Sequence, residues 1–227
     1  AKARDGTRLS VDDAVELLTT GTDREGIDSR RKELVLEAAD RRRAEVVGKD
    51  VTFVANINNN VTTACNTGCK FCNFKDRSEQ FRKSYQDDHG GFTKTPAESR
   101  EIVADAVEMG VYEVTSVSGL HPAFALDEEH REILETSDRG GLNYRPPAEY
   151  DTDPGTYCEQ MRAMSVDDVH VHSMTPEEAY HARRDTEWDY TEVYGRLKDA
   201  GLDSVPGTAA EILVDEVRDI ICPGKIG

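Results

Sequence analysis

Three cysteines that lie close together carry the clearest chemical signal in the sequence. Cys65, Cys69 and Cys72 are spaced as C-x3-C-x2-C directly after a predicted strand. Thiolates this close together favour an iron–sulfur cluster or zinc. A structural zinc site needs four ligands, usually as two separated pairs, and the sequence holds no second pair of cysteines. Three thiolates leave one metal position open, which a cluster that acts on a substrate requires.

The other cysteines and the start of the chain bear on the cellular compartment. Because three of the five cysteines fall within eight residues, an extracellular disulfide framework is not expected. Cys158 and Cys222 stand alone and are expected to be ordinary buried or loop thiols. No N-terminal segment combines a basic region, an apolar core and a small-residue cleavage site, so the sequence predicts a cytoplasmic protein. It begins with Ala1 rather than Met, so we expect a processed or partial chain.

Composition excludes several classes of protein. Of the 227 residues, 37% are hydrophobic and 32% are charged. No apolar run approaches the roughly 20 residues that cross a bilayer, which excludes an integral membrane protein. Asp and Glu number 45 against 28 Lys and Arg, a net charge of −17 that repels nucleic acids and anionic membranes as partners. Such acidity is typical of a saline, halophile-like cytoplasm, where salt screens the repulsion.

Alternating strands and helices must position the cysteines. The first predicted strand covers residues 51–58 and leads into the cysteine loop. Two predicted helices open with a Thr-Pro-x-Glu capping signal, at Thr95 and at Thr175, and a last helix is predicted over 209–221. Four strands alternating with helices predict an α/β fold with a parallel sheet, whose functional loops lie at the carboxyl ends of the strands. The other predicted strands cover residues 111–117, 169–173 and 202–205.

The sequence divides into a short helical extension and a larger α/β part. Residues 1–50 predict two helices, the first capped by Ser10 and the second over 31–46. The α/β part covers residues 51–227. Within it, residues 135–157 are rich in proline, glycine and charge and predict a surface insertion without catalytic residues.

The cysteine spacing, with an aromatic residue just before the last cysteine, resembles the signature of the radical S-adenosylmethionine (SAM) enzymes. The resemblance implies that Cys65, Cys69 and Cys72 each hold one iron of a 4Fe-4S cluster. It also implies that the amino and carboxylate groups of SAM chelate the fourth iron, and that Phe71 lies against the adenine.

Further segments resemble one subgroup of these enzymes. They are GLHP at 119–122, VHVHS at 169–173 and a long segment containing PGTAAEIL at 201–213. The subgroup contains FO synthase subunit 2 and two menaquinone-pathway enzymes, aminofutalosine synthase and cyclic dehypoxanthine futalosine synthase. The long segment, with DEVR at 215–218, is most similar to the FO synthase subunit 2 family.

That resemblance implies a substrate pair and a reaction. A 5'-deoxyadenosyl radical would abstract hydrogen from L-tyrosine, the Cα–Cβ bond would break, and the 4-hydroxybenzyl fragment would add to 5-amino-6-(D-ribitylamino)uracil. FO synthase subunit 1 would close the product into a deazaflavin, and an electron donor would reduce the cluster. Two alternatives remain: a menaquinone-pathway enzyme that acts on a futalosine-type nucleoside, and a zinc-stabilised binding or scaffold protein.

The resemblance also implies a partial (β/α) barrel, with the N-terminal helical extension in front of it. The sequence predicts four βα units where the family's barrel has six, so we expect a barrel truncated after four units. Its C-terminal strands would be missing, and an open sheet edge of this kind favours association.

Three histidines are candidates for contact with the ligands. His170 and His172 share one face of a strand, and on a buried parallel strand that face belongs to the barrel interior. The resemblance assigns His170 to SAM and His172 to the substrate; the alternative is a hydrogen-bonded pair of core histidines. His121 ends the second predicted strand, where it would contact the substrate or else fix the turn at Pro122.

Three more residues complete the candidate site. Ser118 and Gly119 stand where the family has a glycine-rich strand end whose backbone contacts the amino group of SAM. Glu211 follows a strand and a tight turn, so its carboxylate could bind a ribose or ribityl hydroxyl of the substrate. Alternatively, it complements the dipole of its helix.

Overall fold

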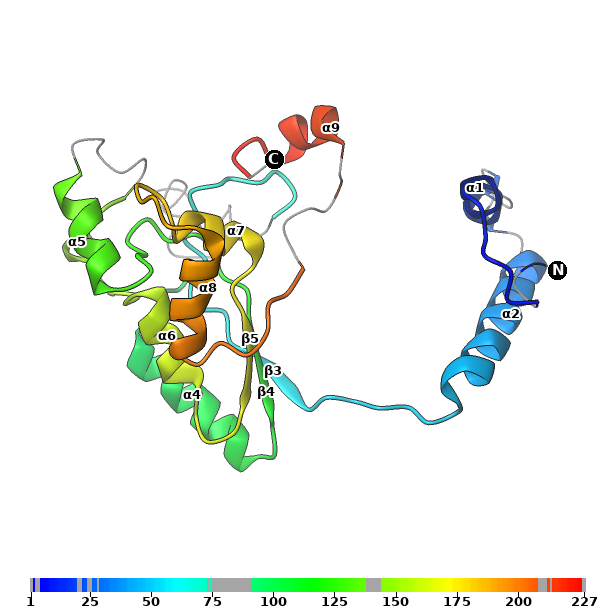
Figure 1. Ribbon diagram of the computed structural model, residues 1–227, viewed down its shortest axis with the longest axis horizontal. Helices are drawn as coiled ribbons and strands as arrows, with labels where there is room; N and C mark the ends of the chain where they lie inside the picture. Colours follow the sequence, from blue (N-terminus) through cyan, green and yellow to red (C-terminus); the bar gives the residue numbers. More distant parts are fainter. Residues whose placement is uncertain are drawn as a thin grey trace. The chain divides into compact units, whose positions relative to one another are not determined.

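The computed structural model forms two compact units, residues 1–53 and residues 54–227 (Figure 1). The described residues are 2, 5–19, 22–23, 26–27, 29–72, 74, 91–137, 144–207, 212 and 214–225.

The first unit contains the two predicted helices. They are α1 (Val11–Thr19) and α2 (Ser29–Val47), with a short antiparallel pair between them, β1 (Thr22–Asp23) and β2 (Gly26–Ile27). Ser10 caps α1 as predicted, since its Oγ accepts a hydrogen bond from the backbone N–H of Asp13 at 3.1 Å.

The second unit is built on a parallel sheet of three strands in the order β3-β4-β5. They are β3 (Asn56–Asn58), β4 (Glu113–Ser116) and β5 (His170–Ser173). The fourth predicted strand is reduced to one parallel bridge, between His172 and Ser204. The first strand is shorter than predicted because its pairing with β4 begins only at Asn56, so residues 51–55 lie outside it.

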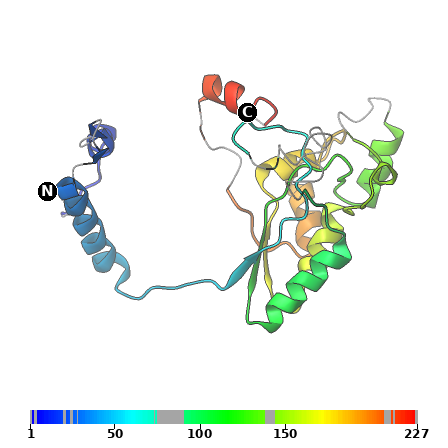
Figure 2. The same ribbon diagram turned by 180° about the vertical axis from the view of Figure 1, so that it is seen from behind.

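Register separates an apolar face of the sheet from a polar one. Ile57, Val114 and Val171 lie side by side in the three strands, and the last two are fully buried in the hydrophobic core. Figures 1 and 2 show that α4, α6 and α8 cover this face. Because successive strand residues point to opposite faces, the residues on either side of these three belong to the other face.

The capping signals predicted from the sequence are confirmed. α4 (Pro96–Glu108) begins at a capping box in which Thr95 and Glu98 bond each other's backbone N–H. α7 (Pro176–His181) begins with the same arrangement at Thr175, and α8 (Tyr190–Asp199) follows it.

Two helices and part of the predicted insertion differ from the expectation. α5 (Glu128–Thr136) and α6 (Tyr157–Met164) were not predicted. The prediction that all of 135–157 is a surface insertion was wrong, because residues 154–157 are buried. The physical reason is that Thr156 caps α6, most of whose side chains pack into the core.

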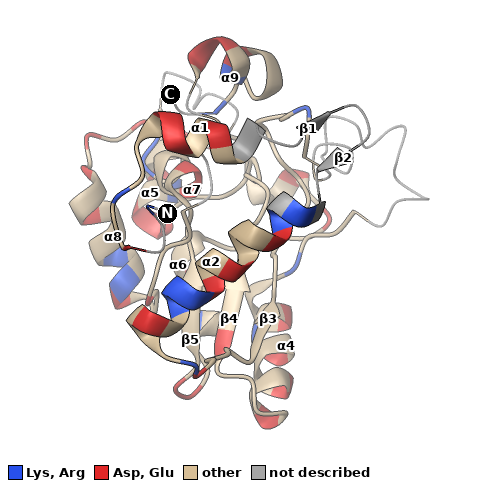
Figure 3. Ribbon diagram, turned by 90° about the vertical axis from the view of Figure 1, so that its right-hand side faces the viewer, with Lys and Arg blue, Asp and Glu red and all other residues tan. Residues whose placement is uncertain are grey.

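The last helix, α9 (Asp215–Ile221), matches the end of the one predicted over 209–221; residues 208–211 lie outside the described part of the chain. Figure 3 shows acidic residues along several helices, among them α4, where Arg100 stands among four carboxylates. Among the described helices, none combines the length and apolar character that crossing a membrane requires.

One arginine ties two helices together. The guanidinium of Arg196 on α8 bonds two carboxylates at the start of α5 and one carboxylate of its own helix. It also lies 4.0 Å from the ring centroid of Trp188, a favourable cation–π distance. The three carboxylates belong to Asp127 at 2.9 Å, Glu129 at 2.7 Å and Glu192 at 2.8 Å.

We expect Arg196→Ala to lower the free energy of unfolding by about 2 kcal/mol, because it removes several charge-assisted bonds and a cation–π contact together. Urea unfolding measures the change. Arg100→Ala, on the exposed face of α4, is the matched control and should change stability by less than about 0.5 kcal/mol. Equal effects of the two substitutions would contradict a stabilising role of the network.

Candidate functional site

The cysteines lie on the loop that leaves β3. Cys69 is buried at 5% exposure, while Cys65 and Cys72 are partly exposed. The turn between them depends on Gly68, whose φ of +65° is a conformation that favours glycine. The backbone N–H of Cys72 donates to the carbonyl of Cys69 at 3.2 Å, which closes the turn. All three thiols therefore project from one short, hydrogen-bonded segment.

One support of the cysteine loop is the segment before α4. It runs antiparallel to the loop, with Lys94 N–H donating to the carbonyl of Val61 at 2.9 Å. The Lys94 ammonium donates to Asn59 Oδ1 at 2.6 Å and to the carbonyl of Asn60 at 2.8 Å. Lys94 thus ties down the point where β3 becomes the loop.

A second support is the turn after β4, which contains Ser118 and Gly119. The Ser118 hydroxyl accepts a hydrogen bond from Val61 N–H at 2.7 Å, and Gly119 N–H donates to the carbonyl of Thr62 at 2.9 Å. A side chain at Gly119 would place its Cβ 2.2 Å from the carbonyl oxygen of Ala64, so only glycine allows this approach. These two residues hold the cysteine loop in place, and their predicted contact with SAM stays a prediction.

The thiols influence one another electrostatically. The pKa of Cys69 is raised to about 11, chiefly by burial; the Lys225 ammonium opposes the rise, and the negative charges of Cys65, Cys72 and Cys222 add to it. The charged groups therefore lie within electrostatic reach of Cys69. A bound metal would overcome the raised pKa, because a coordinating thiol is deprotonated outright.

This donor set suits a four-iron cluster. Thiolates are the ligands that such clusters use, and each one binds a separate iron. Among the residues described, no three His, Cys, Asp or Glu side chains converge on a point where one metal ion could bind. A cluster does not require that convergence, and the three thiols of a single loop would supply three of its four corners.

The polar face of the sheet carries both His170 and His172, which were expected to share one face. Asn58, Thr115 and His172 lie side by side in register. His172 Nδ1 lies 2.6 Å from Ser204 Oγ, and His170 Nε2 lies 2.7 Å from the same oxygen. Because one hydroxyl donates only one hydrogen, at least one imidazole must donate to it. Ser204 was missed in the sequence, where only its place in a predicted strand hinted at it.

His121 lies apart from that pair. It is 1% exposed, and its Nδ1 accepts a hydrogen bond from Ala123 N–H at 3.1 Å, so the proton of the neutral ring is on Nε2. Its ring packs against Tyr150 at a centroid distance of 4.6 Å and against Phe124 at 5.9 Å. These contacts fix the turn after β4, and a contact with substrate stays a prediction. Glu211 lies outside the described residues.

Glu178 joins two strand ends, a role that the sequence did not indicate beyond its capping box. Its Oε1 accepts a hydrogen bond from Ser118 N–H at 3.3 Å, and its Oε2 accepts one from Thr175 N–H at 2.8 Å. Burial raises the pKa of this carboxyl to about 7, although the two hydrogen bonds act to lower it. Its charge state is therefore coupled to the turn that supports the cysteine loop.

We expect Glu178 to make stability depend on pH. Its pKa is higher in the folded chain than in the unfolded one, so folding binds a proton and stability falls as pH rises through about 7. Relative to wild type, Glu178→Gln should gain up to about 3 kcal/mol between pH 4.5 and pH 8. Urea unfolding across that range measures the difference.

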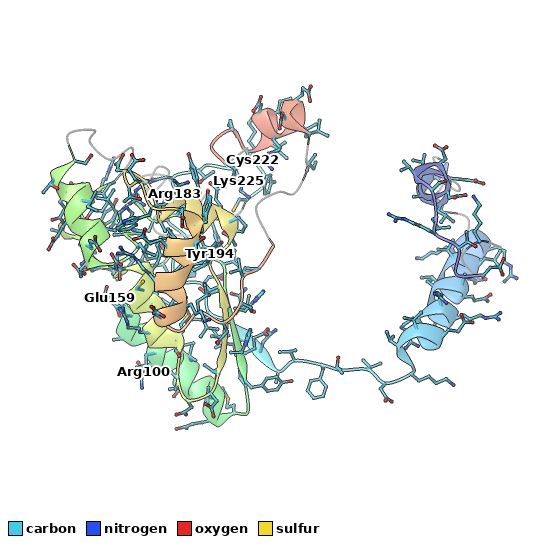
Figure 4. All side chains as sticks on the ribbon, in the orientation of Figure 1. Arg100, Glu159, Arg183, Tyr194, Cys222 and Lys225 are labelled. Atoms are coloured by element: carbon cyan, nitrogen blue, oxygen red, sulfur yellow. The ribbon has the colours of Figure 1, made fainter. Side chains whose placement is uncertain are left out.

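The control for Glu178→Gln is Glu159→Gln, which changes the equivalent capping-box glutamate of α6 at a partly exposed position (Figure 4). Its stability difference from wild type should change by less than that of Glu178→Gln across the same range. A parallel pH profile for Glu178→Gln and wild type would show that the buried carboxyl does not titrate there.

The comparison with protein families identifies a match over most of the chain. Residues 59–217 match the family described as the radical SAM superfamily. The matched stretch begins at the residue after β3 and reaches into α9. It therefore contains the cysteine loop, both of its supports and the paired histidines.

Several curated relatives share one name, 5-amino-6-(D-ribitylamino)uracil--L-tyrosine 4-hydroxyphenyl transferase. The protein of Haloarcula marismortui is 81% identical over 226 residues, and that of Halobacterium salinarum is 69% identical over 226. That of Microcystis aeruginosa is 34% identical over 228 residues. Each alignment covers 100% of this chain and 50% of the relative. The chain thus spans about half the length of the curated relatives it matches.

The family match confirms the interpretation of the cysteine spacing. It rules against a zinc-stabilised scaffold, because the family is defined by SAM chemistry at an iron–sulfur cluster and the described thiols suit that cluster. On the match of residues 59–217, the chain belongs to the radical SAM superfamily.

Proposed function

We propose that this chain acts in joining the 4-hydroxybenzyl group of L-tyrosine to 5-amino-6-(D-ribitylamino)uracil, a step in deazaflavin (FO) synthesis. The observation that carries the proposal is the 81% identity, over the whole chain, to a relative named as that transferase. The menaquinone-pathway alternative is not favoured, since the relatives from Haloarcula, Halobacterium and Microcystis all carry the transferase name.

The cysteine loop and the turn after β4 form the proposed cofactor site. When bound, the 4Fe-4S cluster and SAM supply an electron and a carbon-centred radical. Cys65, Cys69 and Cys72 would hold the cluster, and the half-exposed ring of Phe71 is accessible for stacking on an adenine. The proposed contacts to SAM are Phe71, Ser118, Gly119 and His170.

The polar face of the sheet supports the proposed substrate site. The pyrimidine and its ribityl chain present many hydrogen-bonding groups, and the row of Asn58, Thr115 and His172 offers matching donors and acceptors. Ser204 orients the two imidazoles of this face. We propose that His172, His121 and Glu211 contact the substrate.

The proposal places the reaction at the carboxyl ends of the strands. A carbon-centred radical would react with solvent partners, so the protein must exclude water around it. The loops after β3, β4 and β5 are hydrogen-bonded to one another, which gives that end of the sheet a fixed form. The proposed partial barrel would supply the remaining walls.

Partners and location follow from the same proposal. The product would pass to FO synthase subunit 1, and a separate electron donor would reduce the cluster. We propose a cytoplasmic location, and the net charge of −17 disfavours nucleic acid as a partner.

Anaerobic turnover tests the proposal. The reconstituted chain is incubated with SAM, dithionite, L-tyrosine and 5-amino-6-(D-ribitylamino)uracil, with the Haloarcula relative as the positive control. Release of 5'-deoxyadenosine that requires both substrates is expected. Release without tyrosine, or with a futalosine-type nucleoside in place of both substrates, would contradict the proposed function.

A further inference from the structure

The segment that follows α9 is docked on the cysteine loop, although some 150 residues separate them in sequence. Lys70 N–H donates to the carbonyl of Ile221 at 2.7 Å. A Cβ at Gly224 would lie 3.0 Å from the carbonyl oxygen of Thr67, so the two backbones are in close contact. Figures 1 and 2 both show this segment beside the loop after β3.

Docking brings one charged side chain to the thiols. Lys225, labelled with Cys222 in Figure 4, is held by its own backbone N–H, which donates to the carbonyl of Cys222 at 3.1 Å. Its ammonium lies 5.6 Å from the ring centroid of Phe71, within the range of a cation–π contact. It also acts through space on the buried Cys69, where it favours the thiolate.

A cation at this position has a specific consequence for an iron–sulfur site. Reduction adds one negative charge to a cluster that already bears three thiolates, in a chain with a net charge of −17. Net charge around a cluster is one of the factors that set its reduction potential. A fixed ammonium stabilises the reduced form more than the oxidised form.

We propose that Lys225 is a positioning residue of the iron–sulfur site, which raises the reduction potential of the cluster and orders the ring of Phe71. The proposal rests on membership of the radical SAM superfamily and is independent of the transferase activity. It therefore stands or falls separately from the proposed substrates.

The test is a potentiometric titration of the reconstituted full chain, followed by the electron paramagnetic resonance signal of the reduced cluster. Lys225→Met should lower the ratio of reduced to oxidised cluster at a fixed potential by about tenfold, which is 59 mV for a one-electron couple. Lys225→Arg keeps the charge and should stay near wild type.

The matched control is Lys198→Met, which removes an exposed lysine from the last turn of α8. This helix runs antiparallel to the strands, so Lys198 lies toward their amino ends, away from the cysteine loop. Its substitution should leave the potential unchanged. An unchanged potential in Lys225→Met, or an equal shift in Lys225→Arg, would overturn the proposal.

Iron analysis of each variant shows whether the cluster has been lost. If Lys225→Met fails to retain iron, the iron content of Lys225→Gln and Lys225→Arg is measured as well. The comparison uses variants whose circular dichroism spectra match that of the wild type. Loss of iron from Lys225→Met and Lys225→Gln but not from Lys225→Arg would support the positive charge as what the cluster requires. Loss from all three overturns the proposal, because the packing of the segment would then be what the site requires.

Discussion

Replacing Cys69 with alanine should leave a folded chain without its cluster. Iron should fall from about four atoms per chain to near zero, because a single loop supplies all three thiolates and two cannot hold the cluster firmly. Under the proposed function, cluster-dependent release of 5'-deoxyadenosine should fall to below about one thousandth of wild type, since the radical would depend on the cluster. Iron analysis, visible absorption and the anaerobic assay measure these changes.

The matched control for Cys69→Ala is Cys158→Ala. Both thiols are buried, and burial raises the pKa of each to about 11. Cys158 lies on α6 against the carbonyl of Arg196 at 3.8 Å, among core residues rather than on the cysteine loop. The Cys158→Ala chain should keep its iron and lose only a small amount of stability. Full iron in Cys69→Ala would show that the cluster is bound elsewhere.

Those features of the fold that depend on neighbouring residues could be predicted from the sequence. The cysteine motif is local, because the ligands of the proposed cluster come from eight consecutive residues. The capping boxes at Thr95 and Thr175 are local as well, since each needs only four residues in order. The alternation at His170 and His172 placed both imidazoles on one face, as the strand register confirms.

Features that depend on distant parts of the chain could not be predicted. Ser204 bonds both histidines from 32 and 34 residues away, and its place in a predicted strand does not reveal which side chains it meets. α6 was hidden because its capping threonine, Thr156, follows a segment whose prolines and glycines indicate a loop. The docking of Lys225 near Phe71 joins the two ends of the α/β unit, a contact that only the folded chain creates.

The turn after β4 leaves no room for a side chain at Gly119, next to the cysteine loop. Gly119 is the point of closest approach: a Cβ there would meet the carbonyl oxygen of Ala64 at 2.2 Å and the Cβ of Cys65 at 3.2 Å. The first of these contacts is with backbone, which cannot rotate away as a flexible side chain can. Either the turn or the cysteine loop must move to accommodate a methyl group.

We therefore expect Gly119→Ala to lower the free energy of unfolding by about 3 kcal/mol and to reduce the iron bound per chain. Gly195→Ala is the control, because a Cβ on that residue of α8 meets nothing within 4 Å and alanine favours a helix. It should leave iron unchanged and raise stability by up to about 1 kcal/mol. Urea unfolding measures the stability of both variants, and iron analysis measures the iron that each one binds. If Gly119→Ala bound full iron at wild-type stability, the cysteine loop would have to be held by its other contacts alone, and the close approach at Gly119 would not be what positions Cys65.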